Sequence, residues 1–185
     1  MNALFETAPS FEHPLSVLKH CHGRIKKQLA TLSKLGSYLE KHGADAEAQA
    51  AAQAVLRYFR IAAPLHHEDE EINLLPVLEE LCQQLSQQLG QQHDASQFAE
   101  WQQTILVQHQ RMHELWLTLA KQLDSIQAGI TPAWDNDAVQ TFIHLYTEHI
   151  NLEESCILPL AERLFSTEQM HALALAMQER RAPSI

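Results

Sequence analysis

The sequence predicts an all-α fold: an antiparallel up-down-up-down four-helix bundle with a short extra C-terminal helix. The 185 residues include only five Gly and seven Pro, and abundant Ala, Leu, Gln and Glu favour helix almost throughout. Apolar residues also recur at helical spacing in four long stretches. Because short connections join these stretches, an antiparallel bundle is the simplest arrangement.

The first two helices are predicted from proline, glycine and apolar spacing. Pro14 stands where a first helical turn tolerates proline, and Gly43 is expected to end this helix. The second helix is expected to begin near Ala44 and to continue to about Leu85. Pro64 should kink it, because proline lacks the backbone N–H that a helix interior uses.

Glycine and proline also delimit the third helix. A turn is expected in the Gln-rich tract that Gly90 interrupts. The third helix is then expected over roughly residues 95–128, with Gly129 as its stop. Thr131 and Pro132 are expected to open the fourth helix.

The fourth helix is expected to continue to Pro159 and a break at Ser166 and Thr167. Thr167 has the features of an N-cap, with Glu168 in the first turn of a short fifth helix that runs to about Arg181. The expected division of the chain is an N-terminal segment 1–13, a bundle 14–165, and a C-terminal helix and tail 166–185.

Charge and hydropathy exclude several classes of protein. A net charge of −10 argues against nucleic acid and anionic membranes as partners, because phosphate binding needs clustered Lys and Arg. The chain has no stretch of about 18 apolar residues, and no basic segment followed by an apolar one at its start. We therefore expect a cytoplasmic protein.

The cysteines do not indicate a disulfide framework or cysteine catalysis. They are odd in number and unpatterned, as expected in a reducing compartment. No basic neighbour argues for a depressed thiol pKa at Cys156. No phosphate loop or zinc–thiolate spacing is present either, so no catalytic residue is assigned. The three cysteines are Cys21, Cys82 and Cys156.

Two segments of the chain repeat one pattern of histidine and glutamate. Segments 66–71 and 149–154 each begin with His and carry Glu at their fifth and sixth positions, and Leu-Pro follows closely in both. Upstream, a lone His precedes the first segment by 44 positions and the second by 40. The chain therefore reads as two helical hairpins, with six candidate ligands: His22, His66, Glu70, His109, His149 and Glu153.

This pattern indicates a transition-metal site. A His and a Glu four residues apart share one helical face, so each hairpin supplies half of a site between helices. Each ligand also lies within an apolar stripe, where unpaired imidazoles and carboxylates would cost several kcal/mol per group. A bound metal compensates that cost.

The alternative is that each His is a hydrogen-bonded core residue, which is the commoner fate of a single His on an apolar face. A set of six in the same order twice favours metal. His113 follows His109 by four residues and is a candidate seventh ligand, although Lys26 is its counterpart in the first hairpin. His67 is rotated about 100° from His66, which is consistent with an outer or surface role.

Two further glutamates, Glu71 and Glu154, follow the candidate ligands in both copies. We expect them to be outer partners of the ligands or solvated charges.

These residues resemble the hemerythrin-like, or HHE cation-binding, family of bacterial type. Its pattern is a lone His on the first and third helices and His-x3-Glu on the second and fourth. The resemblance covers residues 14–165 and extends to residues 177–181. It implies a four-helix bundle around a non-haem di-iron centre. The oxygen carriers use Asp five residues after the fourth-helix His, so this chain departs from them at Glu153.

The resemblance also implies a role for each ligand. Glu70 and Glu153 would bridge two irons that also share an oxo or hydroxo ligand. One iron would take His22 and His66, and the other would take His109 and His149 with His113. Mn and Zn accept the same ligands. An apolar wall is expected around the open position, formed by Ile25, Leu29, Met112 and Trp116.

The expected function is to bind dioxygen, or to sense or handle O₂, NO or iron, rather than to turn over a substrate, since metal binding accounts for every ligand. One alternative is a di-iron enzyme that activates oxygen or peroxide, reduces NO or repairs iron–sulfur clusters. Another is an interaction module that metal only stabilises. A monomer or homodimer fits the composition.

Overall fold

The computed structural model describes residues 10–89 and 92–182. Over these residues it is all-helical, without strands, as the sequence predicted. The expected turn at Gly90 and most of the N-terminal segment lie outside the described residues. No helix in the described part is long and apolar enough to cross a membrane.

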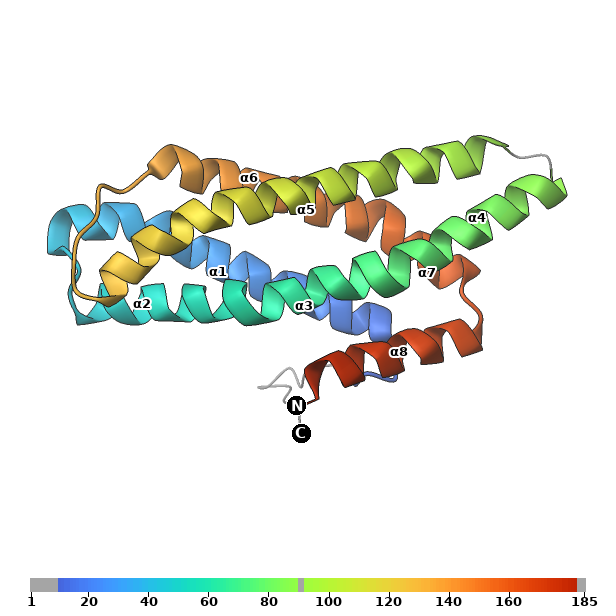
Figure 1. Ribbon diagram of the computed structural model, residues 1–185, viewed down its shortest axis with the longest axis horizontal. Coiled ribbons are helices and arrows are strands. Elements are labelled where there is room, and N and C mark those ends of the chain that lie inside the picture. Colours follow the sequence, from blue (N-terminus) through green and yellow to red (C-terminus); the bar gives the residue numbers. More distant parts are fainter. Residues whose placement is uncertain (1–9, 90–91, 183–185) are drawn as a thin grey trace, which may run out of the picture.

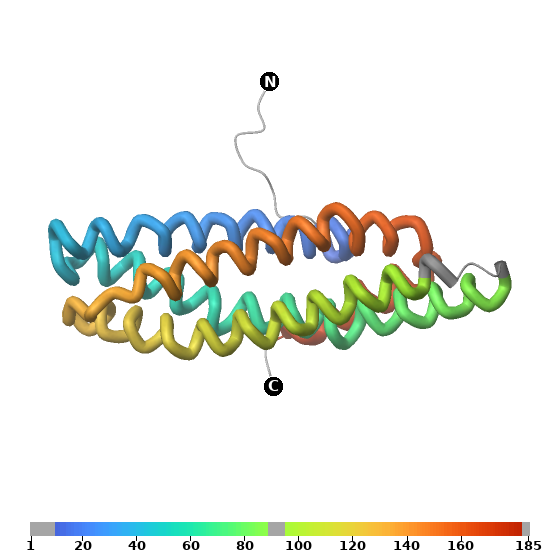
Figure 2. Tube along the Cα trace, turned by 90° about the horizontal axis from the view of Figure 1, so that it is seen from above, coloured from blue at the N-terminus to red at the C-terminus, as the bar shows by residue number. Residues whose placement is uncertain are grey.

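Four long helices lie side by side along the long axis of the molecule, and a fifth, shorter helix lies along one side of them, at the lower edge of Figure 1 (Figures 1 and 2). The first and third long helices are α1 (Pro14–His42) and α5 (Gln92–Gln127). The second comprises α2 (Ala46–Arg57), η1 (Tyr58–Ala62), α3 (Ala63–Glu68), η2 (Asp69–Leu74) and α4 (Leu75–Leu89). The fourth comprises α6 (Asn136–Leu152), η3 (Glu153–Ile157) and α7 (Leu158–Leu164), and the short helix is α8 (Thr167–Arg181).

Packing places the second long helix between the first and the third. Helix α1 packs against α2 and α6, while α5 packs against α2, α4 and α6. Helix α8 contacts η2 and α1. The second long helix therefore presents neighbouring sides of its surface to two different helices.

Three π-helical turns interrupt the second and fourth long helices. The turns η1, η2 and η3 end two residues before Pro64, Pro76 and Pro159 respectively. Proline has no N–H for the α-helical hydrogen bond, so a wider turn ahead of it lets the helix continue. The sequence predicted a kink at Pro64, and the structure has the π turn η1 just before it. The fourth long helix ends at Leu164, in agreement with the break expected at Ser166 and Thr167.

Two helix starts differ from the prediction. The fourth long helix begins at Asn136 rather than at Thr131, because the Asp135 side chain caps it by accepting the N–H of Ala138. Thr131 instead accepts the N–H of Ala44 through its hydroxyl. The fifth helix has Ser166 as its N-cap, one residue before the predicted one.

A layer of buried polar side chains divides the apolar core into two clusters. On the first long helix, Leu18 belongs to one cluster and Ile25 to the other, and on the third Ile105 and Met112 do the same. On the second long helix Ala63 and Leu74 belong to different clusters, and on the fourth Ile150 and Ile157 do. The layer between the clusters contains His22, His66, Asp69, Glu70, His109, His149 and Glu153.

Candidate metal centre

Six of the seven predicted ligands meet in the polar layer. The first and third long helices supply one His each, and the second and fourth supply one His and one Glu each. All six side chains are buried, with at most 5% of any residue exposed. They are His22, His66, Glu70, His109, His149 and Glu153.

The two carboxylates lie between the imidazoles. Glu70 Oε1 is 3.0 Å from His66 Nε2, and its Oε2 is 3.4 Å from His109 Nε2. Glu153 Oε2 lies 3.0 Å from Nε2 of His22 and 3.5 Å from Nε2 of His149. Each carboxylate therefore faces one imidazole from each hairpin.

These contacts define two groups of four residues that can hold a metal ion. One contains His22 and His66, the other contains His109 and His149, and both contain Glu70 and Glu153. Within each group the ligand atoms lie within 4.8 Å of one another. The carboxylates are thus in position to be shared by two cations.

The nitrogen and oxygen atoms of the layer are better placed to bind a cation than to hydrogen-bond to one another. Both carboxylate oxygens of Glu70 and of Glu153, and Nε2 of His22 and of His66, are buried without a hydrogen bond. Such orphaned groups are costly. Ligands bound at about 2.1 Å and at right angles to each other lie about 3.0 Å apart, which is close to the separations found here.

The π turns help to position the two glutamates. Glu70 lies within η2 and Glu153 begins η3. A π turn inserts one extra residue into the helix and changes the direction of the side chains after it, a feature that recurs at functional sites. The Leu-Pro that follows each repeat therefore has a local role beside the ligands.

Two more glutamates contact the outer nitrogens of histidines in the layer. Each glutamate contacts a histidine of the other hairpin. Glu71 Oε1 lies 2.6 Å from His109 Nδ1, and Glu154 Oε1 lies 3.0 Å from His22 Nδ1. Lys26 also donates to Glu154, at 3.3 Å. A carboxylate at Nδ1 keeps the proton there and directs the Nε2 lone pair into the layer. The expectation of outer partners is confirmed for both.

Burial and the carboxylates shift the pKa values in the layer. Burial and the nearby Glu153 raise the pKa of Glu70 to about 8. Burial opposes a charge on His109, but Glu70 and Glu71 outweigh it and raise its pKa to about 9. Burial and neighbouring histidines lower the pKa values of His66 and His149 well below the usual range. Those two imidazoles are therefore neutral at pH 7, with lone pairs available.

His113 is not brought to the layer. It is exposed and lines a pocket of about 100 Å³ together with Met112 and Trp116. Four residues along a helix advance by one turn, and at that level the layer has given way to the apolar cluster around Met112. Of the expected apolar wall, Ile25 and Leu29 lie in this same cluster, while Met112 and Trp116 reach the pocket.

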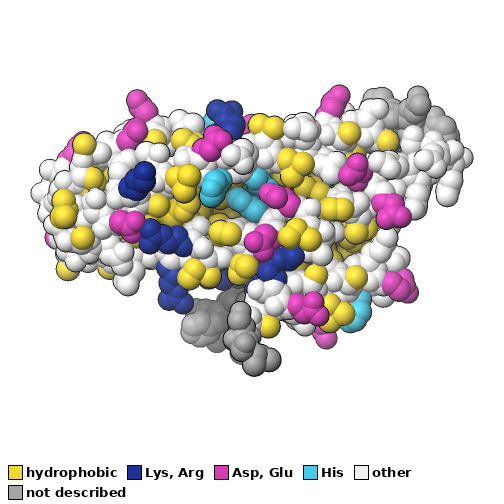
Figure 3. Space-filling model, in the orientation of Figure 1, with side chains coloured by type: hydrophobic (Ala, Val, Ile, Leu, Met, Phe, Trp, Pro, Cys, Tyr) yellow, Lys and Arg dark blue, Asp and Glu magenta, His cyan; other side chains and the backbone are white. Residues whose placement is uncertain are grey.

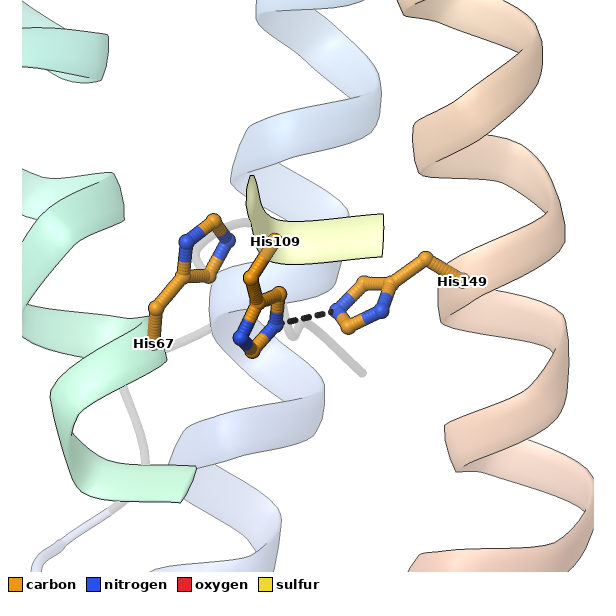
Figure 4. Close-up of side chains that lie close together, drawn as sticks. All are labelled: His67, His109 and His149. Atoms are coloured by element: carbon orange, nitrogen blue, oxygen red, sulfur yellow. Dashed lines mark hydrogen bonds between the residues drawn. The ribbon is translucent and has the colours of Figure 1, made fainter. Parts of the chain in front are cut away.

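His67 approaches the layer instead. Its ring stacks on that of His109, with centroids 3.9 Å apart and planes 11° from parallel, and His149 lies on the other side of His109 (Figure 4). The sequence interpretation missed this contact. The repeat held a signal, since Ile150 is the residue that corresponds to His67 in the second hairpin.

The cysteines take no part in the layer. None of the three forms a disulfide in the described part of the chain, and Cys82 is buried. Burial raises the pKa of the Cys21 thiol, which disfavours the reactive thiolate.

Comparisons with known proteins agree with the geometry. A family model described as the hemerythrin HHE cation-binding domain matches residues 13–161. A protein of Haemophilus influenzae, described as uncharacterized, is 32% identical over 145 residues, which cover 78% of this chain and 77% of that protein. The chain therefore belongs to the hemerythrin HHE cation-binding domain family.

Proposed function

We propose that this chain holds a pair of iron ions in the polar layer and uses them to bind dioxygen, or to sense or handle O₂, NO or iron. The observation that carries the proposal is that two groups of four ligands share Glu70 and Glu153, whose buried oxygens have no hydrogen bond. One ion would be held by His22 and His66, and the other by His109 and His149.

The donor set supports iron. Imidazole with carboxylate suits iron, although manganese and zinc accept the same ligands. Carboxylates shared by two cations would hold them close enough for a common oxygen ligand, and iron would supply reversible redox chemistry there. The chain would contribute four side chains to each ion, which leaves positions open for a small molecule.

The proposal extends to the whole chain. We infer an antiparallel up-down-up-down bundle over residues 14–165 as the metal-binding unit, with residues 166–185 as an addition to it. We also propose that the protein acts in the cytoplasm as a monomer or homodimer. The short connections between the long helices support the antiparallel bundle.

A gas titration tests the function. The iron-loaded protein is reduced anaerobically and then exposed to O₂ or to NO while its visible spectrum is recorded. We expect a spectral change that reverses when the gas is removed. The variant in which both Glu70→Gln and Glu153→Gln are made should show none. Irreversible oxidation by O₂, together with no response to NO, would contradict the proposal.

A further inference from the structure

A small pocket adjoins the His109 and His149 side of the polar layer. Phe59, Met112 and Trp116 contribute apolar side chains to its lining, and His67 and Tyr146 contribute polar ones. His113 also lines it and is exposed to solvent. Figure 3 shows histidine side chains at the floor of a hollow in this face of the molecule, surrounded by hydrophobic side chains.

His67 links the pocket to the layer. One face of its ring stacks on His109 at 3.9 Å, and its centroid lies 5.9 Å from that of His149. Tyr146 Oη lies 3.5 Å from His67 Nε2, at the outer limit of a hydrogen bond. Of these three histidines, His67 lines the pocket, whereas His109 and His149 do not.

One nitrogen each of His67, His109 and His149 lie within 4.8 Å of one another, so these three residues also form a group that could hold a metal ion. The stacked geometry nevertheless favours His67 as a neighbour of the metal position over a further ligand. A ligating imidazole points a lone pair that lies in its own ring plane at the ion. The rings of His67 and His109 are nearly parallel and 3.9 Å apart, so one ion cannot lie about 2.1 Å from a nitrogen of each and in both planes. A nitrogen of His67 remains available to a small molecule beside that ion.

The two hairpins differ at this position. His67 corresponds to Ile150 in the second repeat, and His113 corresponds to Lys26 in the first. Lys26 pairs with Glu154, which holds the outer nitrogen of His22. His113 lines the pocket instead. The two sides of the layer are therefore chemically unequal, and the pocket belongs to the His109 and His149 side.

We propose that this pocket is where a small, weakly polar molecule binds on the His109 and His149 side, and that His67 is the side chain that hydrogen-bonds to it. The inference rests on the proposed function. The volume of about 100 Å³ corresponds to about three water molecules in the liquid, enough for a diatomic or triatomic molecule. The apolar wall favours such a molecule over bulk water.

The test compares three variants of the full chain with the wild type. His67→Ile makes the repeat symmetric with Ile150, and His67→Gln keeps a hydrogen-bonding group. His144→Ala, which removes an exposed histidine of α6 outside the pocket, is the control. The probes are azide for the oxidised iron-loaded protein and NO for the reduced one. The measurements are iron per chain, melting temperature, probe affinity and the vibrational frequency of the bound probe.

We expect His67→Ile to keep wild-type iron content and to lose about two- to tenfold in probe affinity, the value of one hydrogen bond. The probe frequency should shift in this variant. His67→Gln should recover part of both effects, and His144→Ala should change neither. Gln also guards against misfolding of the Ile variant, since it retains a polar group at the layer.

Three outcomes would overturn the inference. Loss of iron in both His67 variants would make His67 a ligand. Unchanged affinity and frequency in His67→Ile, with iron retained, would exclude its contact with the probe. A wild-type protein that binds no iron would overturn the proposed function, and this inference with it.

Discussion

At the scale of single residues, the outer glutamates are expected to affect how well the histidines bind metal. Glu71 Oε1 lies 2.6 Å from His109 Nδ1 and fixes both the ring and its tautomer. We predict that Glu71→Ala lowers metal affinity about 10- to 100-fold, the usual effect of losing such a partner. Competition with a chelator measures it. Glu80→Ala, on the exposed side of α4, is the control, and equal affinities in the two variants would contradict the role of Glu71.

Proton release should accompany metal binding. In the metal-free protein burial and Glu153 raise the pKa of Glu70 to about 8. Against the effect of burial, Glu70 and Glu71 raise the pKa of His109 to about 9. The Glu70 and His109 pair therefore holds at least one proton at pH 7. A metal needs the carboxylate and the neutral imidazole. Both pKa values are raised, so protons compete with metal below them. Affinity should therefore rise with pH between about 6 and 9 and level off above that.

Calorimetry in two buffers of different ionisation enthalpy counts the protons. With Zn²⁺ as a redox-inert probe, at least one proton should be released from the Glu70 and His109 pair at pH 7. Glu70→Gln should lower the number of protons released. An affinity that is independent of pH would show that neither residue binds the metal.

The six residues that meet in the polar layer could be predicted from the sequence because the repeat marks them, and so could the outer Glu71 and Glu154, but the position of His67 could not. Periodicity gives the angle between His66 and His67, about 100°, and not the helix that each of them faces. His66 faces His22 on α1, with ring centroids 5.0 Å apart, while His67 faces His109 on α5. In a bundle, one step of 100° moves a side chain from one neighbouring helix to the next.

At the scale of helices, alanine substitutions at two glycines of α1 are expected to have opposite effects on stability. A Cβ at Gly36 would lie 2.6 Å from Trp134 Nε1, whereas a Cβ at Gly23 would have nothing within 4 Å. Alanine is favoured over glycine in a helix interior by about 1 kcal/mol. We expect Gly23→Ala to stabilise the protein by up to about that amount and Gly36→Ala to destabilise it by about 1–3 kcal/mol through overpacking.

Urea denaturation of both glycine variants measures this difference. Trp134 lies in the loop between α5 and α6, so its fluorescence can report whether that loop remains packed on α1. A stable Gly36→Ala variant with unchanged fluorescence would mean that the loop does not hold the indole against Gly36.

The C-terminal helix is attached to the metal segment through a buried carboxylate. Asp69 is fully buried in η2, beside Glu70, and pairs with Arg180 and Arg181 of α8. Arg180 also donates to Asn73, at 2.8 Å. Removing both arginines leaves Asp69 as an unpaired buried charge.

We predict that Arg180→Ala combined with Arg181→Ala destabilises the protein by about 3–5 kcal/mol. Adding Asp69→Asn should restore part of that loss, because the uncompensated charge is then gone. Chemical denaturation of the three-substitution variant against the double variant measures it. If the Asn substitution made the double variant less stable, the charge would not be the cause.

The boundaries of the helices could be predicted only in part. Gly43 ends α1 as expected, with φ of 66° and its N–H bonded to Leu39. The start of the fourth long helix was misplaced because Thr131 and Pro132 resemble a helix start. Asp135 supplies the cap instead, and Thr131 is used by the backbone of Ala44. Such competition between partners distant in sequence is not visible in local patterns.

At the scale of the whole molecule, the polar layer explains why each long helix has a polar segment between two apolar ones. Each long helix passes from one apolar cluster through the layer to the other. Helical periodicity predicted the apolar clusters, and the repeat predicted the layer. The asymmetry between the two sides comes from His67, and it required the three-dimensional arrangement of α1, α3 and α5.

The central claim is that the layer is a site for two ions. Metal content per chain and the visible spectrum, measured together after expression in iron-supplemented medium and purification without a His-tag, test it most directly. The account predicts near two irons per chain and a charge-transfer band of an oxygen-bridged pair. One metal per chain, or zinc alone that persists after anaerobic reconstitution with iron, would contradict it.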